Sequence, residues 1–287
     1  MPHESWWRLL LNIQMDHLYL LFCLHKVEEH DALVREISPV MEDYGTWELK
    51  RSFYRQKGSR NLLKERFRPS EETLTIMESE LKMAHESQNP EVIVSAQFSL
   101  GYGLLHAGDL KSAEGWLLEA LENARLIDSR IQEARILAFL STLYRQMGDV
   151  ERTVEYTFMA GEKGAAVGSR HFVAHSLANS AWLAYHRGEI ELALEKARMA
   201  AREFNDTKVP LAWLALFVLL AIYTDAGDID RAKEAAAAML DPMQQRLPDD
   251  LTALLEGAVK SWEQQDIKKT CEFLNQTIEL AKGSGYL

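Results

Sequence analysis

Cysteine is scarce in this chain, which has only Cys23 and Cys271 among its 287 residues. Two cysteines near opposite ends cannot form the dense disulfide framework of a small secreted domain, and such low usage is typical of a reducing compartment. Residues 1–5 (MPHES) also lack the positively charged start of a secretory signal. We therefore expect a cytoplasmic protein.

An excess of basic residues is missing as well. The chain has 32 Lys and Arg against 43 Asp and Glu, a formal net charge of −11. This balance argues against general binding to nucleic acid or to an anionic membrane. The one long apolar run, LAWLALFVLLAIY at residues 211–223, would be about 20 Å long as a helix, against roughly 30 Å of hydrocarbon in a bilayer. We expect it to be a buried helix.

Motifs for catalysis and metal binding are also lacking. The sequence has no P-loop and no nucleophile elbow, and GYGLLHAG at 101–108 does not have the spacing of a dinucleotide-binding loop. His171 and His175 are four residues apart, as zinc ligands can be, but neither a third ligand nor a metalloprotease glutamate accompanies them. The sequence therefore predicts no catalytic residue, no cofactor and no metal site, and a protein that is not an enzyme.

The sequence does contain a repeated turn. A glycine followed by an acidic residue recurs at spacings of 40, 40 and 39 residues, at Gly108, Gly148, Gly188 and Gly227. A weaker copy, Gln265–Asp266, follows 38 residues later. A fixed period in this range indicates a solenoid of repeated helix pairs. In YRQMGDVER (144–152) we expect Gly148 to end one helix in the left-handed conformation and Asp149 to cap the next.

A second series of candidate helix boundaries lies between these turns, at Asn89–Pro90, Asp128–Ser129, Gly168–Ser169 and Asp206–Thr207. Each pair offers a helix-capping oxygen, and Pro90 and Pro210 suit a first helical turn. The alternation and hairpin turns of β-sheets are absent. We therefore predict an all-α chain of about seven antiparallel helix hairpins. They would form one domain, 1–287, with repeats at approximately 5–45, 46–88, 89–128, 129–168, 169–206, 207–247 and 248–287.

These repeats resemble the tetratricopeptide-repeat (TPR) family. LSTLYRQMGDVERTVEYTFMA (140–160) carries the family's pattern of Tyr144, the Gly148–Asp149 turn and the small residues Thr153 and Ala160. The resemblance covers residues 91–240 and is weaker in the first and last repeats. HEAT and armadillo repeats share the period of about 40, but the glycine turn with spaced alanines favours TPR. The resemblance implies a right-handed α-solenoid whose first helices line a concave groove.

A narrower resemblance concerns RPSEETL (68–74), GDLKSAE (108–114) and NSAWLAYHRGEIELAL (179–194). With the long period, they are similar to the C-terminal repeat arms of bacterial signalling ATPases, including adenylate/guanylate cyclase–ATPase fusions and maltose-activator-like regulators. This resemblance implies a sensor or regulatory arm that binds a protein or peptide. The alternative is a stand-alone regulator that senses a peptide or small effector and switches a transcription factor.

If the first helices line the groove, a periodic set of polar and aromatic side chains points into it. These candidates for partner contact are Tyr102, His106, Arg135, Arg145, His175, Asn179, Trp182 and His186. Arginine and aromatic residues are enriched at energetically dominant interface positions, and arginine can hold a carboxylate or phosphate. The alternative, at any single position, is that the rings belong to the core between repeats and the arginines are solvated.

Two further segments stand out. Residues 50–68, interrupted at Gly58–Ser59, carry eight basic side chains and one acidic one. A solvated or internally paired face is favoured there over binding to nucleic acid or to an acidic partner. Residues 6–15 are apolar in several directions, so we expect a second copy or an upstream domain to cover this end. The polar residues of 268–282 suit the cap of a solenoid.

Overall fold

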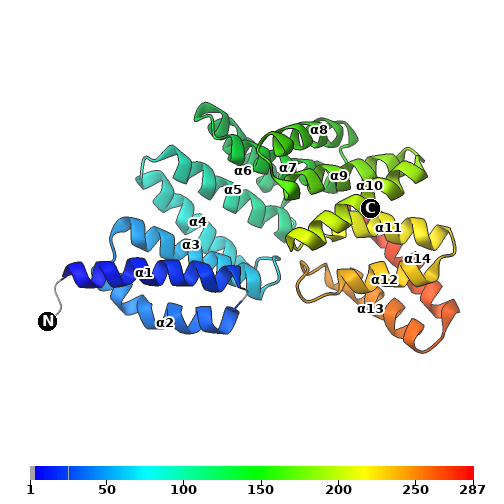
Figure 1. Ribbon diagram of the computed structural model, residues 1–287, viewed down its shortest axis with the longest axis horizontal. Helices are drawn as coiled ribbons and strands as arrows, with labels where there is room; N and C mark the ends of the chain where they lie inside the picture. Colours follow the sequence, from blue (N-terminus) through cyan, green and yellow to red (C-terminus); the bar gives the residue numbers. More distant parts are fainter. Residues whose placement is uncertain (1–3, 25) are drawn as a thin grey trace. The chain divides into compact units, whose positions relative to one another are not determined.

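The computed structural model describes residues 4–24 and 26–287, and this part of the chain contains α-helices and no strands (Figure 1). The helices are α1 (Glu4–Cys23), α2 (Val27–Tyr44), α3 (Trp47–Lys64), α4 (Glu71–Glu86), α5 (Pro90–Ala107), α6 (Leu110–Leu126), α7 (Arg130–Gln146), α8 (Val150–Ala166), α9 (Arg170–His186), α10 (Ile190–Thr207), α11 (Trp213–Asp225), α12 (Ile229–Met239), α13 (Asp249–Glu263) and α14 (Ile267–Gly283). The prediction of an all-α helical-repeat chain is confirmed.

The contacts divide the chain into two compact units. Unit 1 ends at Asp109 and contains α1 to α5, and unit 2, Leu110–Leu287, contains α6 to α14. The single continuous domain expected from the sequence stays a prediction, and each unit is described by itself.

The repeated glycine turn has the predicted geometry. Gly148 has a φ of +71°, and the amide of Asp149 donates to the carbonyl of Tyr144 at 2.9 Å. Oδ1 of Asp149 accepts from the amide of Arg152 at 3.0 Å and so caps α8. Positive φ angles recur at Gly108, Gly188 and Gly227. The pair is therefore a structural device that ends one helix and begins the next.

One predicted junction is wrong. Asp206 and Thr207 belong to the last turn of α10, and α11 begins only at Trp213, after Pro210. Lys208 ends α10 in the left-handed conformation, with a φ of +56°. Asp206 does not cap the next helix but forms an ion pair with Arg170, 3.2 Å away on α9. The other predicted junctions coincide with the starts of α5, α7 and α9.

Helix α9 lies at the centre of unit 2. It packs against α7 and α11, the first helices of the neighbouring hairpins, and against α8 and α10. The second helices approach closely because their contact positions are small; the wholly buried ones include Ala113, Ala120, Thr153, Ala160, Ala193, Ala200 and Ala232. Every residue of α11 from Trp213 to Tyr223 is buried, as predicted for the apolar run. No described helix is long and apolar enough to span a bilayer.

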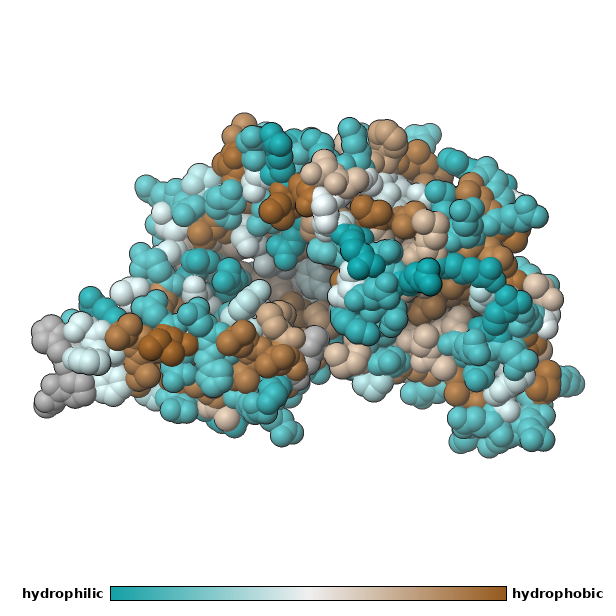
Figure 2. Space-filling view, in the orientation of Figure 1, coloured by the Kyte–Doolittle hydropathy of each residue, from teal (hydrophilic) through white to brown (hydrophobic). Residues whose placement is uncertain are grey.

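In unit 1, α1 buries one face and exposes another. Leu11, Met15 and Leu18 pack with residues of α2 and α3. Its other side exposes Trp6, Leu9, Leu10, Ile13, Tyr19 and Leu20. Figure 2 shows hydrophobic residues gathered over this helix.

The interruption expected at Gly58–Ser59 is wrong: the basic segment is helical through both residues as far as Lys64, where α3 ends, and Arg66 and Arg68 follow the helix. Several of its charges have partners within unit 1: Arg60 forms an ion pair with Asp31 of α2, and Lys57 Nζ lies 4.7 Å from the ring centroid of Phe53. These contacts support the expectation that part of the basic charge is paired within the protein.

Candidate functional site

The most unusual side chain of unit 2 is Arg145, at the end of α7, because its guanidinium group is completely buried. Its Nη1 donates to Oδ1 of Asn179 at 3.3 Å and to the carbonyl of Leu214 at 2.8 Å. Its Nη2 donates to the carbonyl of Tyr286. Three neutral oxygens, from α9, α11 and the segment after α14, therefore hold one cation.

Two tryptophan rings flank this cation. Cζ of Arg145 lies 5.7 Å from the ring centroid of Trp182 and 5.6 Å from that of Trp213. The ring of His186 packs against Trp182, with 4.2 Å between centroids. A cation near aromatic faces is attracted to them, and the attraction grows where water is excluded. The indole rings thus contribute to holding a charge that the protein has removed from solvent.

Within the part of the chain that the structure describes, no carboxylate is paired with Arg145. Burial lowers the pKa of its guanidinium to about 9, so the group remains charged at neutral pH. Its Nε has no hydrogen-bond partner among the residues that the structure describes. A buried cation without a carboxylate is costly for folding. Such perturbed groups concentrate at functional sites, which makes this cluster the first candidate.

The cluster is covered by a short segment, Gly285–Leu287, that follows α14. The ring of Tyr286 lies 4.7 Å from that of Trp213 and 5.6 Å from that of Phe217. Leu287 is only 2% exposed. Gly285 has a φ of +75°, and a Cβ atom there would lie 2.4 Å from the carbonyl oxygen of Gln146. Glycine is therefore required for this close approach.

The structure brings together four of the eight residues predicted to line a groove. Arg145, Asn179, Trp182 and His186 form the cluster, and Nδ2 of Asn179 also donates to Oγ of Ser141 at 2.8 Å. Burial and, second, the charge of Arg145 lower the pKa of His186. Arg145 does not fit the solvated alternative. These four residues can hold a carbonyl or carboxylate oxygen and an aromatic ring.

Two other predicted residues of unit 2 lie elsewhere. His175 is buried between the rings of Phe139 and Phe204, with centroid distances of 4.9 and 5.5 Å. Arg135, in the second turn of α7, is half-buried, and its Nη1 lies 3.5 Å from Oε1 of Gln132. Their part in binding stays a prediction.

The remaining two predicted residues lie on α5 in unit 1. The rings of Phe98, Tyr102 and His106 follow one another along that helix, with centroid distances of 6.0 and 4.4 Å. Burial lowers the pKa of His106 to about 3, so its imidazole is neutral at physiological pH. Within residues 4–24 and 26–287, no three His, Cys, Asp or Glu side chains are placed to hold a metal ion.

The segment after α14 and its contacts on α11 were not predicted from the sequence. Tyr286, Trp213 and Phe217 belong to the cluster, but residues 211–223 indicated only a buried helix. The sole signal in the sequence was GSGYL at 283–287, in which two glycines precede an aromatic and an aliphatic residue. Such a pattern predicts a turn without indicating where the following side chains pack.

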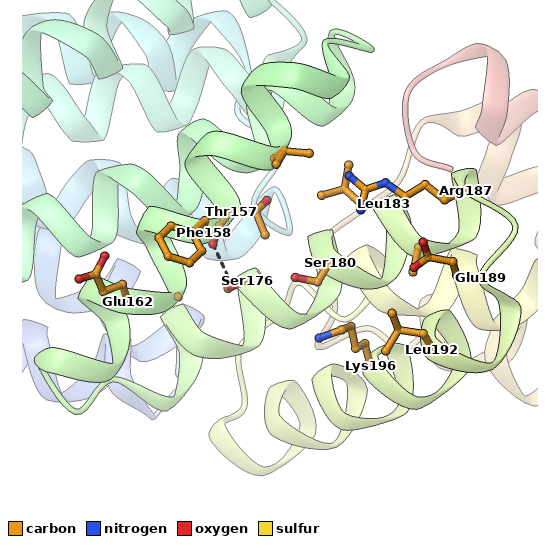
Figure 3. Close-up of a pocket in the computed structure, with 13 residues that line it drawn as sticks. Thr157, Phe158, Glu162, Ser176, Ser180, Leu183, Arg187, Glu189, Leu192 and Lys196 are labelled. Carbon is orange, nitrogen blue, oxygen red and sulfur yellow. Dashed lines mark hydrogen bonds between the residues drawn. The ribbon is translucent and has the colours of Figure 1, made fainter.

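A second candidate is a surface groove of about 580 Å³ among α8, α9 and α10 (Figure 3). Phe158 of α8, 73% exposed, lies on one side of it, and Leu192 and Lys196 of α10 lie on the other. In its floor, Oγ of Ser176 donates to the carbonyl of Thr157 at 2.9 Å. The groove has apolar walls and charges of both signs, and Oγ1 of Thr157 is buried in its lining without a hydrogen-bond partner among the described residues. One hydroxyl group does not indicate a particular ligand.

No protein-family model matches the chain, and no curated protein matches its sequence. Solved structures do match. A STAND (Signal Transduction ATPase with Numerous Domains) protein with a tetratricopeptide repeat sensor, from Pyrococcus horikoshii, is 21% identical with a TM-score of 0.58; the match covers 86% of this chain and 37% of that protein. NprR in complex with its cognate peptide NprX is 18% identical with a TM-score of 0.58, over 94% of this chain and 78% of NprR. The apo form of RapI is 14% identical with a TM-score of 0.52, over 96% and 99%.

The present chain thus spans little more than a third of the STAND protein. At such identities the likeness concerns the fold. Together with the fourteen helices of the described residues and their repeated glycine turns, it shows that the chain has a TPR-like helical-repeat fold.

Proposed function

We propose that the protein is a non-enzymatic, peptide-binding regulator and that the Arg145 cluster of unit 2 is its binding site. The observation that carries the proposal is the hydrogen bond from Arg145 to the backbone carbonyl of Tyr286. It supports a site suited to peptide backbone, because the acceptor belongs to a non-helical segment rather than to the repeats. The fold likeness to NprR, whose structure contains a cognate peptide, supports the same class of ligand.

The chemistry of the site favours a peptide with an aromatic residue. Trp182 and Trp213 offer ring faces, and Arg145 offers donors that neutral or anionic oxygens can accept. Aromatic and arginine side chains dominate the energetics of many interfaces. A strongly basic peptide would meet the buried positive charge of Arg145 and would bind poorly.

The experiment is selection of binders from a displayed random peptide library on the purified chain, followed by titration of the selected peptides. We expect aromatic residues to be enriched and the Arg145→Met variant to lose affinity by about tenfold or more. The matched control is Arg130→Met, since Arg130 is exposed on the same helix. Selected peptides that bind both variants as tightly as the unaltered chain would contradict the assignment of the site.

The biological setting is proposed from the sequence resemblance and the fold. We place the protein in the cytoplasm, as the sensor or regulatory arm of a bacterial signalling ATPase, cyclase or transcription regulator; the STAND protein with a tetratricopeptide repeat sensor supports this setting. The alternative is a stand-alone regulator that switches a transcription factor. A neighbouring reading frame that encodes an ATPase module would favour the arm, and a neighbouring transcription factor would favour the alternative.

The exposed face of α1 supports a second contact. Its apolar side chains, among them Trp6, Ile13 and Leu20, lie in solvent, and exposed apolar patches commonly mark interaction sites. We propose that a second copy of the chain or an upstream domain covers this face.

A further inference from the structure

We infer that the segment Gly285–Leu287 is an internal ligand of unit 2. It occupies the subsite for an aromatic residue, so an external peptide that carries an aromatic residue followed by an aliphatic one must displace it in order to bind. The inference rests on the proposed peptide-binding function and specifies both the class of peptide and the regulation of the site.

The contacts of the segment are those that a bound peptide would make. Its backbone contributes the carbonyl of Tyr286 to Arg145, and its aromatic side chain packs against Trp213 and Phe217. The next side chain, Leu287, is buried. A Tyr-Leu pair therefore fills a site built by α7, α9 and α11 from outside the helical repeats.

The segment can leave without unfolding a helix. Helix α14 ends at Gly283, and the amides of Tyr286 and Leu287 both donate to the carbonyl of Ala281, in the last turn of that same helix. Two side chains from distant parts of unit 2 hold the backbone of the segment: Arg145 donates to the carbonyl of Tyr286, and the imidazole of His186 contacts the backbone of Leu287. Release would therefore cost these contacts and the ring contacts, while the packing between repeats would remain.

The site also contains polar groups that the segment leaves unused. Nε of Arg145 and Nε1 of Trp182 have no hydrogen-bond partner among the described residues, although both side chains are buried. A peptide that placed acceptors opposite these two donors would have an advantage over the internal segment, because buried donors without acceptors are costly. Such hydrogen bonds would allow an external peptide to bind more tightly than the internal segment and so to displace it.

Two variants free the site in different ways. Deletion of residues 284–287 removes the segment. Gly285→Ala keeps it but places a Cβ atom 2.4 Å from the carbonyl oxygen of Gln146, at a φ of +75° that disfavours alanine, so the segment can no longer lie in place. Gly283→Ala is the matched control, because no atom lies within 4 Å of a Cβ there.

The probe is the N-acetylated, C-amidated peptide Ser-Gly-Tyr-Leu, titrated against each form while tryptophan fluorescence is recorded. We expect it to bind the deletion variant and Gly285→Ala about tenfold or more tightly than the unaltered chain and Gly283→Ala. Ser-Gly-Ala-Leu should not bind any form. Circular dichroism establishes that each variant is folded. The deletion variant and Gly285→Ala should bind the probe alike, because both leave the site unoccupied.

Equal binding of the probe to all four forms, or no binding to either folded, freed variant, would overturn the inference. The proposed function fails separately. If library-selected peptides bind the unaltered chain and the deletion variant equally, without competition from the probe, the peptide-binding function is supported and the internal-ligand inference is contradicted. If the probe binds the freed variants but no external peptide displaces the segment, the segment is an internal ligand and the proposed peptide-binding function is contradicted.

Discussion

Arg145 and Tyr286 are 141 residues apart in the sequence, and the guanidinium of the first donates a hydrogen bond to the backbone carbonyl of the second. This relationship joins the middle of unit 2 to the segment that follows its last helix. Because Arg145 is fully buried and has only neutral acceptors, its surroundings must be intact for its charge to be tolerated.

The first prediction concerns the geometry of this cation. Arg145→Lys keeps the charge but replaces a planar group with five donors by a compact ammonium with three, which cannot reach the oxygens of Asn179, Leu214 and Tyr286 together. We expect the free energy of unfolding of unit 2 to fall by about 2–4 kcal/mol, measured by urea denaturation. The exposed Arg130→Lys should change it by less than about 0.5 kcal/mol. Equal effects of the two substitutions would show that the buried contacts contribute little.

The second prediction compares two glycines with open space around their Cβ positions. Gly148 has a φ of +71°, whereas Gly115 lies inside α6. Gly148→Ala should destabilise the chain by about 1 kcal/mol because alanine disfavours the left-handed region, and Gly115→Ala should stabilise it by a similar amount because alanine favours a helix. Thermal unfolding followed by circular dichroism measures both. Effects of the same sign would contradict the structural role assigned to the repeated turn.

The third prediction is a pH dependence in unit 1. Glu80 is 4% exposed, and burial raises the pKa of its carboxyl to about 7, against the opposing charges of Arg55 and Arg51. Because the folded pKa is raised, the stabilisation is complete below about pH 4.5 and is lost as the pH rises through 7. Glu80→Gln, which cannot ionise, should therefore gain about 3 kcal/mol relative to the unaltered chain between pH 4.5 and 8.

The measurement is the urea midpoint of each chain at several pH values between 4.5 and 8. Glu78→Gln, at an exposed position two residues earlier on α4, is the control and should follow the unaltered chain. A constant difference between Glu80→Gln and the unaltered chain across this range would argue that Glu80 has an ordinary pKa.

The fourth prediction concerns the exposed face of α1. We expect the isolated chain to self-associate through it, because burial of Trp6, Ile13 and Leu20 against a second copy removes apolar surface from water. Size-exclusion chromatography with light scattering should show a dimer, and Ile13→Glu with Leu20→Glu should give a monomer. Leu126→Glu, at an exposed apolar position of unit 2, should leave the dimer unchanged. A monomeric unaltered chain would restrict the proposal to an upstream domain.

The repeats could be predicted because their signals are local. The turn needs a residue that accepts a positive φ, followed by a side-chain oxygen that caps the next helix. Both requirements involve only a few neighbouring residues, so the roles of Gly148 and Asp149 could be assigned from the sequence. The junction before α11 could not, because Asp206 and Thr207 have capping side chains but lie inside the last turn of α10. There the pairing of Asp206 with Arg170, on another helix, accompanies a longer α10.

Only part of the candidate site could be predicted from the sequence. Helical spacing assigned Arg145, Asn179, Trp182 and His186 to one groove, and they do contact one another, because first helices of adjacent hairpins pack side by side. Their part in binding stays a prediction. The same spacing could not separate them from His175, which lies in the core between Phe139 and Phe204. One turn of a helix can face a neighbouring helix while the next faces a ligand site, and periodicity treats both alike.

By itself, then, the sequence determined the helices, their turns and their period, since each depends on conformational preferences within a few residues. Only the tertiary structure decided that Arg145 is buried and that Tyr286 covers it. The physical reason is that no local preference links two residues 141 positions apart: their contact forms only after the intervening helices have packed and brought the end of α14 against α7 and α11.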